Sequence, residues 1–241
     1  MSSCIENKQS NKPFVSAVIV SAGSSSRMGG VNKQFLDLNG LPVIARSISA
    51  FQENCLIDEI IIVTRECDIE KISCLVKQNS YTKVSQIIVG GSTRQESVLN
   101  GIYACSADCE FIAVHDGARP LVTQKVISDT VCNAFKYLAS AAAVRVKDTV
   151  KTVDADGFIT ATPDRTFMRF VQTPQVFEKK LYLNAVNSVA DSSGFTDDCM
   201  LIEAFGKKVF LTEGDYENIK ITTPEDISFA KVFLDRRKNY D

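Results

Sequence analysis

Short apolar segments alternate with segments of helical spacing along the first two-thirds of this chain, and this alternation limits the folds open to it. Between the apolar segments, residues such as Ile44, Ile48 and Phe51 recur at the spacing of one helix face. Because strand–helix–strand crossovers place helices on both faces of a sheet, the pattern predicts an α/β fold with a doubly wound, mainly parallel, Rossmann-like sheet. Ligands bind such sheets at the carboxyl ends of the strands. The predicted strands are 15–20, 60–63, 85–89, 111–114 and 142–146.

Residues 147–169 interrupt this alternation. A turn at Asp154, Asp156 and Gly157 separates two segments of alternating polarity, which predicts a β-hairpin. The parallel sheet offers the hairpin no evident place, so we expect either a protruding arm that packs on a partner or a simple surface hairpin. Beyond it we predict helices at 178–187 and 197–205, strands at 209–211 and 218–221, and a last helix that begins at Thr223-Pro224.

Composition excludes several classes of protein. The 27 Lys and Arg residues nearly balance the 29 Asp and Glu residues, whereas non-specific nucleic-acid binding would show a basic excess. No apolar run is long enough to span a membrane, and the polar first dozen residues lack the apolar core of a signal peptide, so we expect a cytoplasmic protein. The eight cysteines form no Cys-x-x-Cys pair and His115 is the only histidine, which favours free thiols over disulfides or a zinc site.

A loop of small residues follows the first predicted strand. Ala22, Gly23 and the three serines after them lack bulk, so the backbone there can approach a ligand closely. Arg27 and Lys33 add two cations, which suits a phosphate-binding loop; the alternative is a flexible turn. The loop is neither a Walker A loop, because Met28-Gly29-Gly30 replaces the Gly-Lys-Ser/Thr end, nor a dinucleotide fingerprint, because Ser25 takes the place of the second glycine.

Two further motifs follow predicted strands. The paired glycines of GGSTRQES, residues 90–97, permit close approach to a flat ligand such as a base, or form an ordinary strand-to-helix turn. In HDGARP, residues 115–120, Asp116 would bring a carboxylate to the phosphate site, where a divalent cation such as Mg²⁺ would lie between them; the alternative is a cap of a helix or turn. For His115 we expect a packed or hydrogen-bonded role.

Taken together, the motifs identify a family. SAGxxxRMG followed by KQF, then GGxxRxxS, HDGARP, DTVK, DR, TPQ and NIK occur in this order over residues 15–234. In these motifs the chain resembles the 2-C-methyl-D-erythritol 4-phosphate cytidylyltransferases of the non-mevalonate isoprenoid pathway. It departs from the family pattern at Ser21, where Ala is frequent, at Ser25, where Gly is frequent, and at Ser92, where some relatives carry Asp.

The resemblance implies a role for each of these residues. CTP would be held by Ser21, Ala22, Gly23, Gly91, Ser92, Arg94 and Ser97. Catalysis would depend on Arg27, Lys33 and Lys220, with Mg²⁺ on Asp116. The sugar phosphate would be held by Thr149, Arg165, Thr173, Thr196, Lys220 and Arg119. The protein would be a homodimer with a shared site, to which the partner subunit contributes Arg165 and Thr173.

The resemblance also implies a domain layout and a reaction. Residues 14–241 would be a single nucleotidyltransferase domain with 147–169 as a dimerisation arm, and the polar character of the first residues predicts a disordered tail over 1–13. The reaction would transfer CMP from CTP to 2-C-methyl-D-erythritol 4-phosphate, with direct attack by the acceptor phosphate and release of pyrophosphate. Two alternatives remain at this point, a ribitol 5-phosphate cytidylyltransferase and a nucleotide-binding regulator without turnover.

Overall fold

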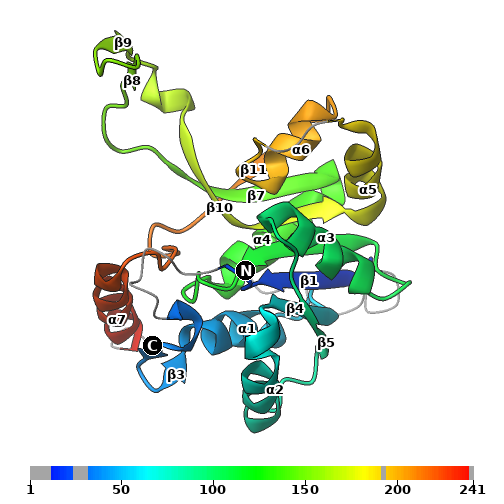
Figure 1. Ribbon diagram of the computed structural model, residues 1–241. Helices are drawn as coiled ribbons and strands as arrows, with labels where there is room; N and C mark the ends of the chain where they lie inside the picture. Colours follow the sequence, from blue (N-terminus) through cyan, green and yellow to red (C-terminus); the bar gives the residue numbers. More distant parts are fainter. Residues whose placement is uncertain (1–11, 24–31, 191–193, 239–241) are drawn as a thin grey trace, which may run out of the picture.

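A seven-stranded, mostly parallel sheet forms the centre of the protein, as the alternating pattern predicts (Figure 1). The computed structural model describes residues 12–23, 32–190 and 194–238. The strand order is β11-β7-β10-β6-β1-β4-β5, and every neighbouring pair is parallel except those that involve β10. The strands are β1 (Val15–Val20), β4 (Glu59–Thr64), β5 (Val84–Val89), β6 (Phe111–Asp116), β7 (Ala139–Arg145), β10 (Arg169–Glu178) and β11 (Phe210–Glu213).

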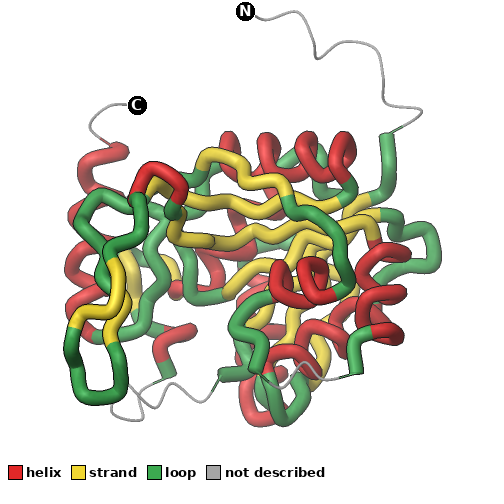
Figure 2. The backbone as a smooth tube through the Cα atoms, turned by 90° about the horizontal axis from the view of Figure 1, so that it is seen from above, coloured by secondary structure: helices red, strands yellow, loops and turns green. Residues whose placement is uncertain are grey.

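Helices cover both faces of the sheet, so the fold is doubly wound (Figure 2). Alternate residues of β1 enter opposite cores, because successive side chains of a strand point to opposite faces. Ala17 and Ile19 pack with α1, α2 and α4, whereas Val18 packs with α3, α5 and α6. These helices are α1 (Val43–Glu53), α2 (Ile69–Gln78), α3 (Arg94–Ala104), α4 (Gln124–Tyr137), α5 (Lys179–Ser188) and α6 (Asp198–Ala204).

The last helix, α7 (Pro224–Lys238), packs at one end of the sheet. Ala230 of α7 shares a small core with Leu38, Val43, Leu121 and Ile221. This core joins α7 to the short hairpin β2 (Asp37–Leu38) and β3 (Leu41–Pro42) and to the segment that carries Lys220. Short 3₁₀ turns lie at Lys33–Phe35, Glu66–Asp68 and Arg165–Phe167.

One predicted strand is wrong and one observed strand was missed. Residues 218–221 form no strand, and the longest strand of the described residues, β10, was not predicted. Its middle part contains the polar residues Gln172, Thr173 and Gln175, and all three side chains are buried. They are buried because partners far away in the sequence satisfy them: the Gln172 amide donates to Asp215 O at 2.8 Å and Gln175 Oε1 accepts from Asp198 N at 3.1 Å.

The predicted hairpin is confirmed. β8 (Thr152–Val153) and β9 (Ile159–Ala161) pair antiparallel at the tip of an arm that projects from the body of the molecule (Figure 1). The arm exposes large apolar side chains, notably Phe158 at 72% and Phe167 at 87%. Large apolar side chains exposed in this way are typical of a contact with another protein.

Two negative findings concern the described residues alone. All of their cysteines are free thiols. None of their helices has the length and apolar character that crossing a lipid bilayer requires. The predicted tail falls largely on residues 1–11, which lie outside the described part of the chain.

Gly101 sets how closely α3 approaches the sheet. A Cβ atom there would lie 2.3 Å from Val18 Cγ1 and 2.9 Å from Val63 Cγ2. We expect Gly101→Ala to lower the free energy of unfolding by about 1–3 kcal/mol, since overpacking outweighs the gain of up to about 1 kcal/mol in helix propensity. Urea unfolding measures this change. In a Val18→Ala background the same substitution should cost less; a Gly101→Ala protein as stable as the wild type would contradict the close packing.

Candidate active site

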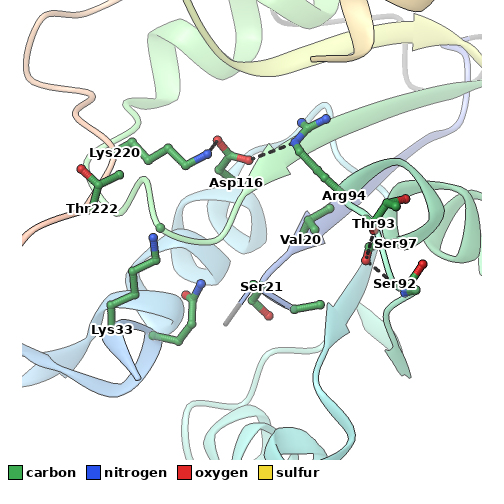
Figure 3. A pocket seen from close by; sticks show the side chains of 15 residues that line it. Val20, Ser21, Lys33, Ser92, Thr93, Arg94, Ser97, Asp116, Lys220 and Thr222 are labelled. Atoms are coloured by element: carbon green, nitrogen blue, oxygen red, sulfur yellow. Dashed lines mark hydrogen bonds and ion pairs between the residues drawn. The ribbon is translucent and has the colours of Figure 1, made fainter. Parts of the chain in front are cut away.

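A cavity of about 480 Å³ lies at the carboxyl ends of β1, β5 and β6 (Figure 3). This is the edge where ligands bind in doubly wound sheets. The cavity brings together ten of the predicted site residues from five segments of the chain. They are Ser21, Ala22, Gly23, Lys33, Gly91, Ser92, Arg94, Ser97, Asp116 and Lys220. Arg27 lies outside the described residues.

Two loops form one wall of the cavity, and glycine is required where they meet. A Cβ atom at Gly90 would lie 2.5 Å from Ala22 Cβ, so the loop after β5 packs directly on the loop after β1. A Cβ atom at Gly91 would lie 2.3 Å from Glu96 Cβ. The paired glycines therefore allow both the loop contact and the tight entry into α3.

The N-terminus of α3 is held by a capping box. The Thr93 side chain accepts from Glu96 N, and the Glu96 side chain accepts from the Thr93 backbone. Glu96 also accepts from Ser92 N and Ser92 Oγ at 2.7 and 2.5 Å. The Ser97 hydroxyl accepts from Gly91 N at 3.1 Å and donates to Thr93 O at 2.9 Å. These bonds hold the loop in shape before any ligand arrives, which is preorganisation of a binding site.

Ser21 anchors the first loop to the sheet. Its backbone N–H and its hydroxyl both donate to Val63 O, at 2.7 and 2.9 Å, and the residue is 3% exposed. The Ser21 hydroxyl is therefore bonded to β4 in this structure.

Asp116 is the electrostatic centre of the cavity. Lys220 Nζ lies 2.8 Å from one carboxylate oxygen, and Arg94 Nε lies 3.7 Å from the other (Figure 3). Arg119 Nε lies 3.6 Å from the oxygen that Lys220 contacts. Burial alone would raise the pKa of Asp116, but the charges of Lys220, Arg94 and Arg119 outweigh burial and hold this pKa well below its usual range. The carboxylate is therefore ionised, and the three cations leave a net positive charge that suits phosphate groups.

Backbone carbonyls hold the side chains of Lys33 and Arg119 in place. Lys33 Nζ donates to Ile221 O at 2.8 Å, which ties the 3₁₀ turn after the first loop to the segment that carries Lys220. Arg119 Nη1 donates to Asn218 O at 2.8 Å in the same segment. Residues 218–222 are thus an irregular strap that Lys33 and Arg119 hold along one side of the cavity.

His115 supports the site from below. It is fully buried, its ring lies 4.8 Å from that of Phe51, and its ring nitrogens contact Thr173 Oγ1 at 3.0 Å and Arg119 O at 3.2 Å. The Thr173 hydroxyl also accepts from Asp116 N at 3.1 Å. The packed and hydrogen-bonded role predicted for His115 is confirmed, and a buried imidazole cannot reach a substrate in the cavity.

The expected origin of Thr173 is wrong. We expected the partner subunit to supply it, but its contacts with His115 and Asp116 of its own chain place it beneath its own cavity. The reason is β10, which enters the sheet beside β6 and carries Thr173 there.

The remaining predicted residues lie outside the cavity wall of their own chain. Thr149 and Arg165 belong to the arm and are exposed; Arg165 Nη1 donates to Lys147 O at 2.7 Å. Thr196 is exposed just before α6, where its hydroxyl contacts Met200 Sδ at 3.4 Å. A single chain therefore does not bring the hydroxyls of Thr149 and Thr196 and the guanidinium of Arg165 to its own cavity.

Sequence reasoning missed a buried carboxylate next to the cavity. Asp198 is the first residue of α6, and its Oδ2 atom lies 2.7 Å from Arg94 Nη1. Burial alone would lower the pKa of Arg94, but Asp198 and Asp116 outweigh burial and raise it above its usual value. The adjacent acids Asp197 and Asp198 were the available signal, but only Asp197, the N-cap of α6, has a role that local sequence reveals.

Comparison with known proteins gives the family of the chain. The family described as IspD, 2-C-methyl-D-erythritol 4-phosphate cytidylyltransferase, matches residues 15–236. The chain belongs to this family. The 2-C-methyl-D-erythritol 4-phosphate cytidylyltransferase of Caldanaerobacter subterraneus subsp. tengcongensis is 50% identical over 224 residues, which are 91% of this chain and 98% of the relative. That of Desulforamulus reducens is 44% identical over 226 residues, 92% of this chain and 96% of the relative.

Solved structures of the cytidylyltransferase family agree with the fold. The crystal structure of 4-diphosphocytidyl-2C-methyl-D-erythritol synthase from Anaerococcus prevotii superposes with a TM-score of 0.83 at 34% identity and covers 92% of this chain and 96% of its own. The 2-C-methyl-D-erythritol 4-phosphate cytidylyltransferase from Thermus thermophilus superposes with a TM-score of 0.73 at 26% identity, over 92% of this chain and 99% of its own. The expected α/β fold and family membership are therefore confirmed.

The burial of His115 predicts a titration. Burial lowers the pKa of His115 from 6.5 to about 4, so its neutral form stabilises the fold fully above pH 6.5 and this contribution is lost as the pH falls toward 4. Because the chain has one histidine, its Hε1 resonance can be followed without overlap from other imidazoles by proton NMR. We expect a constant chemical shift from about pH 8 to about pH 5.5. An inflection near 6.5 would show an exposed ring and contradict the structure.

Proposed function

We propose that this protein transfers CMP from CTP to 2-C-methyl-D-erythritol 4-phosphate, with CDP-methylerythritol and pyrophosphate as products. The observation that carries the proposal is the cavity itself, in which small-residue loops face Lys33, Lys220, Arg94 and the carboxylate of Asp116. The loops suit a nucleotide, and the excess of cations suits the phosphates of two substrates.

The cavity needs no general base for this reaction. The second pKa of a phosphate monoester is about 6, so the attacking oxygen is already anionic at neutral pH. The difficulty of the reaction is repulsion between two anions and the growth of charge on the leaving pyrophosphate. Lys33 and Lys220, together with Arg27 of the same loop motif, counter both effects by holding the reactants in place and stabilising negative charge.

Asp116 fits a magnesium ion that arrives with the nucleotide. Mg²⁺ in nucleotide enzymes is held by one or two carboxylates, substrate phosphates and water. Asp116 offers one ionised carboxylate, and no cluster of three or more acidic, histidine or cysteine side chains exists among the described residues. When bound there, Mg²⁺ would neutralise charge on the triphosphate.

We further propose that the active enzyme is a homodimer with shared sites. The arm exposes Phe158, Phe167 and Ile159, a surface that a partner would cover. Arg165 and Thr149 lie on that arm, outside the cavity of their own chain, and would reach the cavity of the partner to bind the acceptor phosphate. Arg119, which lies 3.6 Å from the carboxylate of Asp116, would act in the cavity of its own chain.

The choice of acceptor tests the proposed reaction. We expect pyrophosphate release from CTP with 2-C-methyl-D-erythritol 4-phosphate at a kcat/KM at least about tenfold above that with ribitol 5-phosphate, because a site built around one polyol leaves polar groups unpaired with another. Asp164-Arg165 and the segment 146–149 favour the methylerythritol substrate. Preference for ribitol 5-phosphate would contradict the acceptor, and CTP binding without release with either acceptor would indicate a regulator.

Mixed dimers test the shared site. We expect Lys33→Ala and Arg165→Ala to lose most of the activity as separate homodimers, and their random mixture to regain about a quarter of the wild-type rate, because half of the dimers contain one site free of both defects. The matched control mixes Lys33→Ala with Lys220→Ala, two residues of one cavity, and should recover nothing. Absence of recovery in the first mixture, with subunit exchange demonstrated by mass spectrometry, would contradict a site built across the dimer.

A further inference from the structure

The Arg94 guanidinium lies between two carboxylates and is closer to the one outside the cavity. Its Nη1 is 2.7 Å from Asp198 Oδ2, whereas its Nε is 3.7 Å from Asp116 Oδ1. Figure 3 shows the Arg94 side chain reaching from the start of α3 toward Asp116, opposite Lys220. Arg94, at the start of α3, thus contacts both carboxylates, and its ion pair with Asp198 is the shorter of the two.

Asp198 is held rigidly on its other side. Its second carboxylate oxygen accepts from the Tyr182 hydroxyl at 2.7 Å, and its backbone N–H donates to Gln175 Oε1 at 3.1 Å. Asp198 is 3%, Tyr182 0% and Gln175 2% exposed. Burial raises the pKa of Tyr182 well above its usual value, so the phenol keeps its proton and remains a donor.

Stability alone is a weak reason for this arrangement. A buried ion pair costs desolvation, and apolar residues of the same volume are frequently as stable or more stable. This pair lies where α3, α5, α6 and β10 meet beside the cavity, and it acts on a side chain that lines the cavity. Removal of the Asp198 charge would leave Asp116 as the carboxylate nearest to Arg94. The guanidinium would then move closer to Asp116 Oδ1, from which its Nε is now 3.7 Å away.

We propose that Asp198 and Tyr182 are positioning residues for the transfer reaction, which hold Arg94 near Asp116 but off its carboxylate. The proposal rests on the proposed function of the cavity. Asp198 fixes the guanidinium, Tyr182 fixes Asp198, and Asp116 thereby keeps one oxygen for the reactants. A displacement of about 1 Å in such a site can cost about a hundredfold in rate.

The test uses two near-isosteric variants in the full-length protein, Asp198→Asn and Tyr182→Phe. We expect kcat to fall by about 10- to 100-fold in Asp198→Asn and by a smaller factor in Tyr182→Phe, with the KM for CTP changed by less than about threefold. The matched control is Glu203→Gln, which removes a charge from an exposed position of the same helix and should leave kcat unchanged. A wild-type kcat in folded Tyr182→Phe and Asp198→Asn proteins would overturn the proposal.

A double-variant cycle separates positioning from simple stabilisation. In an Arg94→Gln background, Asp198→Asn should reduce kcat no further, because its effect acts through Arg94. Full additivity of the two losses in kcat would overturn the proposal. A loss in Asp198→Asn that disappears when the assay temperature is lowered further below the melting temperature would also overturn it, since it would reflect unfolding.

A crystal structure of Asp198→Asn provides a readout without turnover. We expect the Arg94 guanidinium to have moved onto Asp116; an unmoved guanidinium would overturn the positioning role. Failure of the proposed function is distinct, because it would show as a wild-type protein that releases no pyrophosphate. The position of Arg94 in the variant would still show whether Asp198 positions its guanidinium.

Discussion

One buried carboxylate, that of Asp116, holds the site of this protein together. It ends the central strand β6, and cations from three other places in the chain converge on it, namely Lys220, Arg94 and Arg119. An unpaired carboxylate in this position would be very costly, so the buried charge requires these partners. Through them Asp116 sets the position of the strap at 218–222 and of the start of α3, which together form two sides of the cavity.

The antiparallel strand β10 supports this arrangement from below. It brings Thr173 under Asp116, Gln175 to the start of α6, and Gln172 to the segment just before the strap, where its amide donates to Asp215 O. Each of these side chains is buried and bonded to a distant segment. The polar side chains of one strand thus link the parallel half of the sheet to the helices and loops that complete the site, and buried networks of this kind favour a single arrangement.

The chemistry of cytidylyl transfer explains why the site is made of cations and preformed loops. A nucleophile that is already ionised makes a base unnecessary, and the only histidine of the chain is buried as a hydrogen-bonded support for Thr173. Charge neutralisation and alignment are what remain for the protein to supply. The capping box of α3 and the bonds of Ser21 to β4 keep the two loops in shape.

The sequence by itself determined the alternating elements, the edge of the sheet at which the site forms and most residues that line it. These follow from local periodicity and from the rule that the carboxyl ends of parallel strands meet, which brings residues 21–23, 91–97 and 116 together. Only the tertiary structure decided that 169–178 is a central strand, that Thr173 lies under its own Asp116 and that Asp198 pairs with Arg94. Polar side chains such as these read as surface residues in a sequence, because only partners far along the chain make their burial favourable.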